Sequence, residues 1–430
     1  MDNLYKHFLN STGISTDTRT IAEGSFFVAL KGENFDANDM IDLALEKGAY
    51  HIVTTNKKYA GNERVTVVDD TLATLQQLAA FHRAQLDIPI VGITGTNGKT
   101  TTKELVTAVL SKKYKTAATR GNLNNHIGVP LTLLSITNEH DIAVVEMGAN
   151  HPGEIKALAA IVKPTSGLIT NVGIAHIEGF GSFDGVKATK RALYEQVAAD
   201  GGIIFINSNN NNLVEMLPSG YDRLLSYGTD AENCIVDGRA EGDGEMLELE
   251  WRFNNGIYHN ITTNLTGVYN LENVLAAATV GCFYDVPQSD ICLALSEYKP
   301  TNSRSQVVQT SRNRIIVDAY NANPSSMNAS LDNFEHLKGE HKVLILGAMR
   351  ELGSREEEEH RALLQKIASS AYDEVYLVGG EFAKFAAQFP QFHYAENALD
   401  IKEFVERLEG KYILLKGSNS NKLSVLVDYL

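Results

Sequence analysis

The sequence is poor in the features that mark secreted, membrane-spanning or nucleic-acid-binding proteins. Its 430 residues include only three cysteines, nine prolines and one tryptophan. No uncharged apolar run reaches the roughly 18 residues that a membrane span needs. Lys and Arg (38) are outnumbered by Asp and Glu (53), and the formal net charge of −15 excludes the positive field that binding to nucleic acid or anionic membranes requires. An odd number of cysteines without CxxC spacing suits a reducing compartment, in which they would be small buried residues. We expect a soluble cytoplasmic protein without a signal peptide, a membrane insertion or a nucleic-acid partner.

The length and composition indicate a globular protein of two or three domains, because a single core stops growing well below this length. Hydrophobic residues make up 43% of the chain and charged residues 21%, which excludes intrinsic disorder. The patterns divide the chain into three blocks, residues 1–85, 86–299 and 300–430. The second and third blocks alternate strands with helices, as parallel α/β sheets do, and such sheets bind ligands at the carboxyl ends of their strands. We therefore predict an α/β fold with two doubly wound sheets.

Apolar runs and helical spacing predict the individual elements. Strands are expected at residues 25–30, 51–54, 88–94, 142–147, 167–172, 202–207, 314–318, 342–347, 374–378 and 412–416. Helices are expected at residues 37–48, 71–86, 101–113, 152–162, 186–199, 266–282, 325–337, 356–369, 381–389 and 401–408, with a last helix ending at residue 430. A few antiparallel strands are expected between residues 234 and 263, where the pattern becomes short and alternating.

The strongest local signal is a glycine-rich loop between a buried strand and an amphipathic helix. Its residues are Gly95, Thr96, Asn97, Gly98, Lys99, Thr100 and Thr101. Backbone N–H groups in such a turn form an anion cradle, in which Lys99 would reach the β- and γ-phosphates and Thr100 would bind Mg²⁺. The longer Walker pattern asks for glycine where Ile93 stands, so the motif has the shorter G-x-x-G-K-T form. The alternative is an ordinary turn with a surface lysine, but the flanking strand and helix favour a phosphate site.

Three further polar residues lie near the ends of predicted elements. Glu146 closes an apolar strand, where a carboxylate is costly unless it meets a cation or hydrogen-bond donors. His176 follows another strand, and its alternative role is that of an ordinary hydrogen-bonding histidine. Lys190 lies on a predicted helix, and it could equally be a solvated lysine. Phosphoryl chemistry needs charge neutralisation and positioning, which a Mg²⁺ on Thr100 and Glu146 and a second cation near His176 would supply.

A loop rich in asparagine follows the first helix of the second block. It contains Asn122, Asn124 and Asn125. Asparagines of this kind either stabilise turns or form a polar wall for a substrate, and the local sequence leaves both interpretations open.

Taken together, these segments resemble the Mur ligase family. Six strings carry the resemblance across all three blocks: GITGTNGKTTTKE at 92–104, GNLNNHIGVP at 121–130, VEMGAN at 145–150, HIEGFGS at 176–182, DAYNANPSSM at 318–327 and LKGS at 415–418. The phosphate loop alone would not be diagnostic, but the strings are diagnostic together. The resemblance is to the branch that adds D-alanyl-D-alanine to UDP-N-acetylmuramoyl-tripeptide.

The resemblance implies a fold, a reaction and a set of ligands. It implies a three-domain architecture with a UDP-substrate-binding N-terminal domain (1–85), a central P-loop ATPase domain (86–299) and a Rossmann-like C-terminal domain that binds the amine (300–430). It implies ATP-dependent amide ligation through an acyl phosphate, two Mg²⁺ sites and a monomer. Lys190 matches the lysine that becomes carbamylated with CO₂ and binds the second Mg²⁺ beside His176.

The resemblance also assigns the remaining residues. The catalytic group comprises Lys99, Glu146, His176 and Lys190, of which the last three join Thr100 as metal ligands. ATP would contact the phosphate loop together with Asn270, Asn273, Arg304 and Asp318. The substrates would contact Ser15, Thr16, Arg19, Asn124, Asn125, Tyr320, Asn321 and Asn323.

The chain departs from the family pattern at four positions, and rival interpretations remain. The departures are Tyr269 for a usual His, Ala348 for Asp, Asn419 for Arg and Val317 for an acid.

The nearest rival is a Mur ligase that adds diaminopimelate or lysine, or a folylpolyglutamate-type ligase. A diamino acid would favour an arginine in the acceptor motif, and residues 321–324 contain none. A non-ligating P-loop nucleotide switch is the rival from another class, and it has no need for a second metal site.

Overall fold

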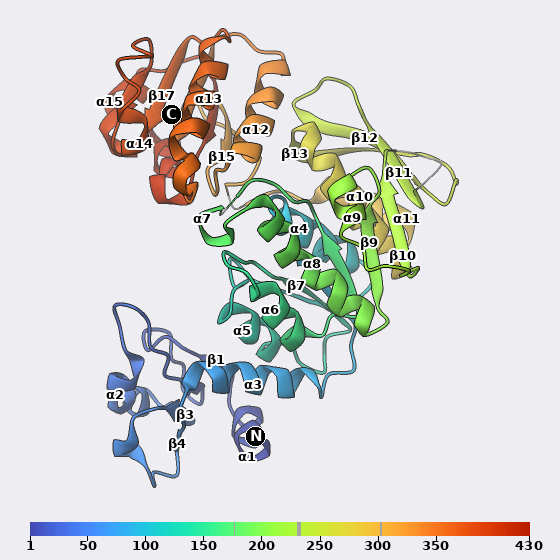
Figure 1. The fold of residues 1–430 in the computed structure, drawn as a ribbon, viewed down its shortest axis with the longest axis vertical. Coiled ribbons are helices and arrows are strands. Elements are labelled where there is room, and N and C mark those ends of the chain that lie inside the picture. The colour runs from blue at the N-terminus through green and yellow to red at the C-terminus, as the bar shows by residue number, and fades with distance from the viewer. Residues whose placement is uncertain (176, 230–233, 302) are drawn as a thin grey trace.

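The protein is built from three parts that follow one another along the chain. The computed structural model describes residues 1–175, 177–229, 234–301 and 303–430. Figure 1 shows the N-terminal part in blue at the bottom, the central part in green and yellow, and the C-terminal part in orange and red at the top. Each part has its own sheet, of four, nine and six strands. The predicted α/β class and three-part architecture are confirmed.

The N-terminal part consists of a small parallel sheet flanked by short helices. The strand order is β1-β2-β3-β4. The strands are β1 (Ile14–Ser15), β2 (Phe26–Val28), β3 (His51–Thr54) and β4 (Val65–Val67). The helices are α1 (Asp2–Leu9), α2 (Ile41–Glu46) after a 3₁₀ turn (Ala37–Met40), a 3₁₀ turn (Lys57–Tyr59) and α3 (Thr71–Arg83). Helix α3 joins this part to the centre, because Arg83 Nε donates to the carbonyl of Val162 (2.9 Å).

The central sheet has the order β13-β12-β11-β10-β9-β8-β5-β7-β6 and is parallel from β11 to β6. Its parallel strands are β5 (Ile90–Thr94), β6 (Thr116–Ala118), β7 (Ile142–Glu146), β8 (Ser166–Ile169), β9 (Ile203–Asn207), β10 (Leu224–Gly228) and β11 (Val236–Glu241). Strands β12 (Met246–Phe253) and β13 (His259–Thr266) are antiparallel, which confirms the alternating pattern predicted there.

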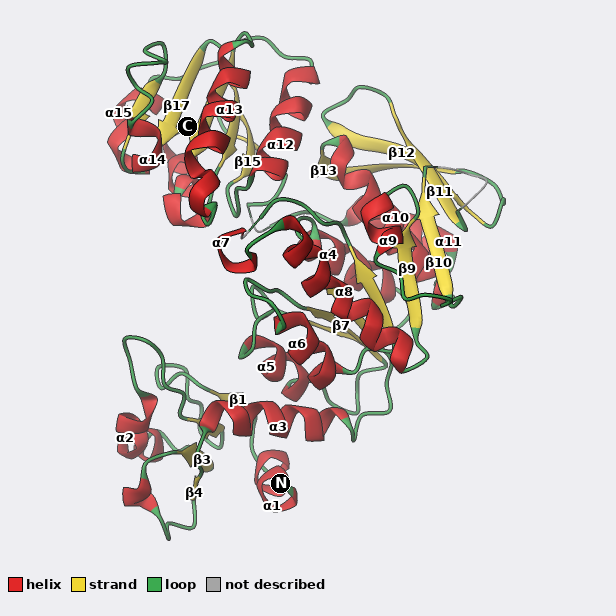
Figure 2. Ribbon diagram, in the orientation of Figure 1, coloured by secondary structure: helices red, strands yellow, loops and turns green. Residues whose placement is uncertain are grey.

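Helices cover both faces of the central sheet, as Figure 2 shows. They are α4 (Lys99–Leu110), α5 (Gly128–Leu134), α6 (Glu154–Val162), α7 (Ile177–Phe180), α8 (Phe183–Ala199), α9 (Asn211–Glu215), α10 (Leu271–Phe283) after a 3₁₀ turn (Val268–Asn270), and α11 (Gln288–Glu297). Alternate strand residues serve the two faces: Val91 and Ile93 pack with α4, α10 and α11, whereas Ile90 packs with α6 and α8. Among the described residues, no helix has the length and apolar character needed to cross a membrane.

The C-terminal sheet has the order β14-β15-β19-β16-β17-β18 and is parallel except for the edge strand β14. Its strands are β14 (Gln306–Gln309), β15 (Arg314–Asp318), β16 (Lys342–Gly347), β17 (Glu374–Val378), β18 (His393–Ala395) and β19 (Tyr412–Lys416). Its helices are α12 (Pro324–His336), α13 (Glu356–Ala368), α14 (Gly380–Ala383) and α15 (Lys402–Val405), with 3₁₀ turns at Gly353–Arg355, Ala398–Ile401, Asn419–Asn421 and Leu423–Tyr429.

Several predicted helices differ from the observed ones. The helix expected at 37–48 is a 3₁₀ turn followed by α2, and the helix expected at 401–408 is α-helical only over Lys402–Val405. The helix expected at 266–282 begins at Leu271, because Thr266 still belongs to β13. The helix expected at 381–389 ends at Ala383, and the following chain runs in turns towards Pro390, whose ring disfavours helix at the residue before it. The expected last helix is a 3₁₀ turn, with Leu423 and Leu426 buried at a spacing of three.

Candidate functional site

A cavity of about 1010 Å³ lies where the carboxyl ends of the central strands face the C-terminal part. It brings together the phosphate loop, the ends of β7, β8 and β10, and the ends of β15 and β19. This is where ligands bind in open α/β sheets. The residues that line it and that the sequence singled out are Thr96, Asn97, Gly98, Lys99, Thr100, Thr101, Asn122, Asn124, Asn125, Glu146, Tyr269, Asn270, Asn273, Arg304, Asp318, Tyr320 and Asn321.

The phosphate loop joins β5 to α4, and its glycines are required by close packing. Gly95 has φ +150°, and a Cβ there would lie 1.9 Å from Thr170 Oγ1. Gly98 has φ +78°, and a Cβ there would lie 2.5 Å from Asn273 Oδ1. The Lys99 ammonium donates to the carbonyls of Gly95 (2.9 Å) and Thr96 (3.0 Å), so it lies across the loop. Burial and the nearby Arg304 lower the pKa of Lys99, although Glu146 opposes them.

Glu146 stands at the end of β7 and is 1% exposed. Its Oε1 accepts hydrogen bonds from Thr100 Oγ1 (3.2 Å) and Asn124 Nδ2 (2.8 Å). Its Oε2 is buried and meets no hydrogen-bond donor in the described chain. A buried carboxylate oxygen beside a threonine hydroxyl is a suitable pair of hard ligands for Mg²⁺. The described residues contain no group of three or more His, Cys, Asp or Glu side chains arranged around a metal site.

Lys190 lies on α8 and is buried, at 3% exposure. Its ammonium lies 5.9 Å from the centre of the Phe180 ring. Burial, followed by the charge of Lys99, holds the pKa of Lys190 well below its usual range. The structure therefore rules out the solvated lysine that the sequence left open. His176, predicted as its neighbour at the metal site, lies outside the described residues, and its role stays a prediction.

One wall of the cavity contains a chain of amide side chains at the start of α10, from Asn270, its N-cap, and Asn273. Asn273 Oδ1 accepts from Thr102 Oγ1 (2.9 Å), and Asn273 Nδ2 donates to Asn270 Oδ1 (2.9 Å). Asn270 Nδ2 in turn donates to the carbonyl of Thr266 (2.8 Å). The Tyr269 hydroxyl, which stands where the family has His, forms a hydrogen bond with Ser305 Oγ (3.0 Å) at the start of the C-terminal part.

The C-terminal part contributes an arginine and an ion pair to the cavity. The Arg304 guanidinium lies 3.7 Å from the centre of the Tyr320 ring, as in a cation–π contact. Its Nε is buried and has no hydrogen-bond partner in the described chain. Asp318, at the end of β15, pairs with Lys416 (2.9 Å) at the end of β19. Lys416 also donates to the carbonyl of Asn321 (3.1 Å).

The predicted asparagines serve the local fold as well as the cavity. Asn125 Oδ1 accepts from the backbone N–H groups of Ile127 and Gly128 (3.1 and 2.8 Å) at the start of α5. Asn323 caps α12 and also donates to Asn97 Oδ1 (2.8 Å), which connects the C-terminal part to the phosphate loop. Turn chemistry and a position beside the cavity, which the sequence treated as alternatives, are therefore combined in Asn125.

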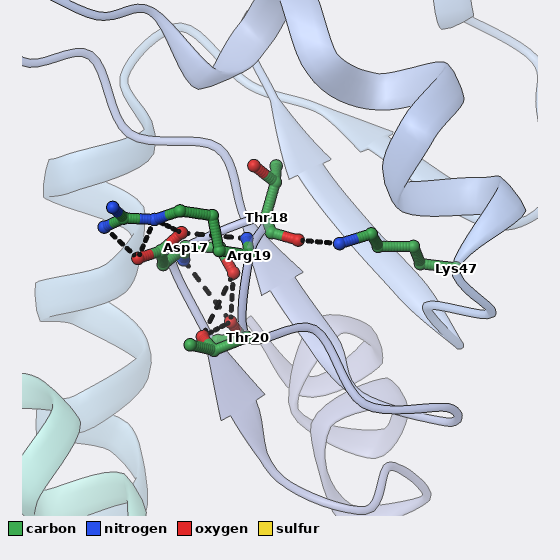
Figure 3. Close-up of polar contacts among 6 residues, drawn as sticks. Asp17, Thr18, Arg19, Thr20 and Lys47 are labelled. Atoms are coloured by element: carbon green, nitrogen blue, oxygen red, sulfur yellow. Dashed lines mark hydrogen bonds and ion pairs between the residues drawn. The ribbon is translucent and has the colours of Figure 1, made fainter.

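The predicted residues Ser15, Thr16 and Arg19 lie on the N-terminal part and are not among the residues that line the cavity. Figure 3 shows the Arg19 side chain folded onto Asp17, with hydrogen bonds from Nε to both carboxylate oxygens (3.0 Å each). The same view shows Lys47 donating to the carbonyl of Thr18 (2.7 Å). Hydrogen bonds donated by Arg19 lower the pKa of Asp17 to about 2. The segment thus forms a preformed polar loop at the other end of the molecule.

Two residues of the site were missed by reasoning from the sequence. Lys416 received no role, although a lysine that closes an apolar strand is as unusual as the carboxylate at Glu146. Asn171 holds the loop on two sides, because its Oδ1 accepts from the N–H of Asn97 (2.9 Å) and its Nδ2 donates to the carbonyl of Asn97 (3.2 Å). The signal was available here too, since Asn171 follows the apolar strand β8.

Comparisons with protein families agree with this geometry. Residues 93–281 match the family model described as the Mur ligase middle domain, and residues 303–419 match the Mur ligase, glutamate ligase domain. The chain belongs to the Mur ligase family.

Individual relatives point to one branch of that family. The UDP-N-acetylmuramoyl-tripeptide–D-alanyl-D-alanine ligase of Bacillus subtilis (strain 168) is 33% identical over 97% of this chain and 93% of its own length. The enzyme of that name from Escherichia coli (strain K12) is 33% identical with the same coverage. Among solved structures, MurF from Acinetobacter baumannii superposes with a TM-score of 0.89 at 28% identity, over 99% of this chain and 97% of that one. The MurF ligase from Thermotoga maritima in complex with ADP gives 0.85 at 26% identity, over 98% and 97%. Within the family, this full-length similarity places the chain in the MurF branch.

Proposed function

We propose that this chain is an ATP-dependent ligase that joins D-alanyl-D-alanine to UDP-N-acetylmuramoyl-tripeptide in peptidoglycan precursor synthesis. The names of its full-length relatives support this function. The observation that carries it is the cavity that unites the phosphate-loop lysine with Arg304, Asp318 and Lys416 of the C-terminal part. A ligase needs such a site, because it must hold a nucleotide and two further reactants in one orientation.

The proposed chemistry has two steps. The γ-phosphoryl group of ATP is transferred to the terminal carboxylate of the tripeptide, which gives an acyl phosphate and ADP. The amine of D-alanyl-D-alanine then attacks the acyl carbon, loses a proton and displaces phosphate, which forms the amide bond. We assign Lys99 to the charge that develops on the transferred phosphoryl group, because its ammonium lies in the loop where phosphates are bound. Binding of ADP by the Thermotoga maritima relative supports a nucleotide at this position.

The remaining nucleotide contacts are assigned by position. We assign Asn270 and Asn273, which line the cavity, to the adenine, and Arg304 and Asp318, which line it from the C-terminal part, to the phosphates and the ribose. The unused buried Nε of Arg304 supports its contact with a bound anion.

Thr100 and Glu146 are the residues that would hold a Mg²⁺ ion. The buried Glu146 Oε2 without a donor supports this assignment, because a cation would satisfy it. When bound, the ion would neutralise phosphate charge and orient the nucleotide. For the second ion we assign His176 and Lys190. The lowered pKa of Lys190 favours the neutral amine, and that amine can add CO₂, forming an N–C bond and releasing a proton. The resulting carbamate is an anionic oxygen ligand.

The substrates are assigned to the three parts, for which we keep the boundaries 1–85, 86–299 and 300–430. The UDP end would lie on the N-terminal part near Ser15, Thr16 and Arg19. The acceptor ends would meet in the cavity near Asn124 and Asn125 on one side and Tyr320, Asn321 and Asn323 on the other. The α3 contact to the centre supports a fixed position of the N-terminal part relative to the cavity.

The test is a ligation assay with a panel of amines. Purified protein receives ATP, Mg²⁺ and UDP-N-acetylmuramoyl-tripeptide, and phosphate release is measured with D-alanyl-D-alanine, meso-diaminopimelate, lysine or glutamate. We expect phosphate release with D-alanyl-D-alanine and with none of the three single amino acids. Release with one of the single amino acids would support the corresponding rival ligase, and ATP binding without any amine-dependent release would support a nucleotide switch.

A further inference from the structure

A turn of the central sheet reaches across to the C-terminal part on the side away from the phosphate loop. It comprises residues 242–245, between β11 and β12, and Gly242 gives it a positive φ of +72°. Glu245 from this turn contacts Arg314 and Tyr412, which belong to the C-terminal sheet. We call these three residues the clasp.

The clasp has the geometry of a strong ion pair. Arg314 Nε donates to both carboxylate oxygens of Glu245 (2.8 and 3.0 Å), and Arg314 Nη2 also donates to this carboxylate. The Tyr412 hydroxyl donates to Glu245 as well. The Glu245 side chain is only 14% exposed, whereas the Arg314 side chain is 49% exposed. Burial alone would raise the pKa of Glu245, but the hydrogen bonds from Arg314 and Tyr412 outweigh it and hold the pKa below its usual range. Such bidentate, partly buried pairs are stronger and more directional than surface ion pairs.

The clasp lies on the same two strands whose last residues line the cavity. Arg314 begins β15 and Tyr412 begins β19, and the two residues are direct partners across the parallel pair. At the opposite end of these strands, Asp318 and Lys416 are also direct partners, and their ion pair lines the cavity. Each strand has five residues, so the clasp lies roughly 13 Å from the cavity ion pair. Because the two strands are short and hydrogen-bonded to each other, fixing their first residues at the clasp also fixes their last residues at the cavity.

We propose that Glu245 is a positioning residue, which holds the C-terminal part in the arrangement that brings Asp318, Lys416 and Arg304 against the phosphate loop. Glu245 is not among the residues that line the cavity. It acts together with other contacts between the two parts, among them the hydrogen bond from Asn323 to Asn97 on the cavity side. The proposal rests on the ligase function proposed above.

The expected effect follows from the energetics of a shared site. If the clasp is weakened, a smaller fraction of molecules has the assembled cavity, and ligands that need both parts bind with an apparent affinity reduced by that fraction. We therefore expect Glu245→Gln to raise the KM for ATP and for the dipeptide roughly fivefold, with little change in kcat. A damaged fold would instead lower kcat, because fewer molecules are active, and leave KM unchanged.

The same turn offers a matched control. Asp243 pairs with Lys338 of the C-terminal part, but both side chains are largely exposed, at 70% and 79%. Exposed pairs of this kind contribute little. Asp243→Asn should therefore leave both kinetic constants unchanged. Arg314→Gln should reproduce the effect of Glu245→Gln, the double variant should be no worse than either single variant, and the exchange Glu245→Arg with Arg314→Glu should recover part of the lost affinity.

A second measurement is independent of the ligation reaction. X-ray scattering of the full chain without ligands should give a larger radius of gyration for Glu245→Gln than for the wild type and for Asp243→Asn. Equal scattering of the three proteins, or a fall in kcat at unchanged KM, would overturn the proposal. If the wild-type protein failed to ligate, the proposed function would fail, while the scattering comparison would still decide whether the clasp holds the parts together.

Discussion

Lys99 is the residue on which the proposed phosphoryl chemistry depends most directly. Its ammonium is fixed by two loop carbonyls and has a lowered pKa in a buried setting. Lys99→Ala should lower kcat of ligation roughly 10²- to 10³-fold, because it removes a preorganised positive charge from the site where negative charge develops. Steady-state phosphate release measures this, and circular dichroism checks that the fold is kept. Near-native turnover by the alanine variant would exclude the assigned role.

Lys190 is the residue whose proposed modification gives a pH-dependent readout. Only the neutral amine adds CO₂, and burial lowers the pKa of Lys190. The amine is therefore neutral at a lower pH than a free lysine would be, and carbamylation decreases as the pH falls through the lowered pKa. We expect removal of bicarbonate to reduce the ligation rate several-fold near neutral pH and its addition to restore the rate. The Lys190→Arg variant should ligate slowly, and its rate should not change when bicarbonate is removed or added. Equal stimulation of the variant would contradict the assignment.

At the level of single residues, the sequence predicted the groups that have a strong local signal. Glu146 could be recognised because a buried carboxylate at a strand end requires partners, and the structure supplies Thr100 and Asn124. The double role of Asn323 could not be recognised from its neighbours. Its capping of α12 follows from local sequence, but its hydrogen bond to Asn97 joins residues 226 positions apart.

At the level of elements, prediction succeeded where burial is complete. The expected strands 51–54, 314–318, 342–347, 374–378 and 412–416 have the observed bounds, because continuous apolar runs with two buried faces leave little ambiguity. Among the missed strands, β10 is an interior strand of five residues, whereas β6 and β14 lie at sheet edges and have three and four residues. Their residues are mixed in character because one face or one edge is solvated, so periodicity gives a weak signal.

In the N-terminal part, where α1 packs beside β3, we expect acid to lower the stability of the fold because of His51 on β3. This ring is stacked on His7 at 3.9 Å, forms a hydrogen bond with Thr66 (2.8 Å) and is 2% exposed. Burial, followed by the charge of His7, lowers the pKa of His51 from 6.5 to about 4. The unfolded chain therefore binds more protons than the folded chain between these values, and stability is lost as the pH falls from about 6.5 towards 4.

We expect this histidine to contribute about 2 kcal/mol of the stability lost between pH 7 and pH 4.5. His51→Gln keeps a polar group beside Thr66 but does not titrate. Urea denaturation at the two pH values should show a smaller loss for the variant than for the wild type. The same loss in both proteins would show that His51 is not the responsible group.

At the level of the whole molecule, the net charge of −15 means that anions must be bound by local positive charges and backbone N–H groups. The structure places such groups in one cavity, which is lined by the phosphate loop with Lys99, by Arg304 and by Lys416. The sequence predicted the α/β class and the three blocks, since both follow from composition and periodicity. The meeting of the second and third blocks around the cavity followed only from the family resemblance, because no local pattern encodes the relative position of two sheets.

The measurement that tests the central claim most directly is the identification of the product by mass spectrometry. Purified protein is incubated with ATP, Mg²⁺, UDP-N-acetylmuramoyl-tripeptide and D-alanyl-D-alanine, and the nucleotide-linked product, ADP and phosphate are quantified together. The account predicts a product heavier than the tripeptide substrate by one dipeptide less one water, formed in equal amounts with ADP and phosphate and dependent on Lys99. ATP turnover without this product, or the product without ATP turnover, would contradict it.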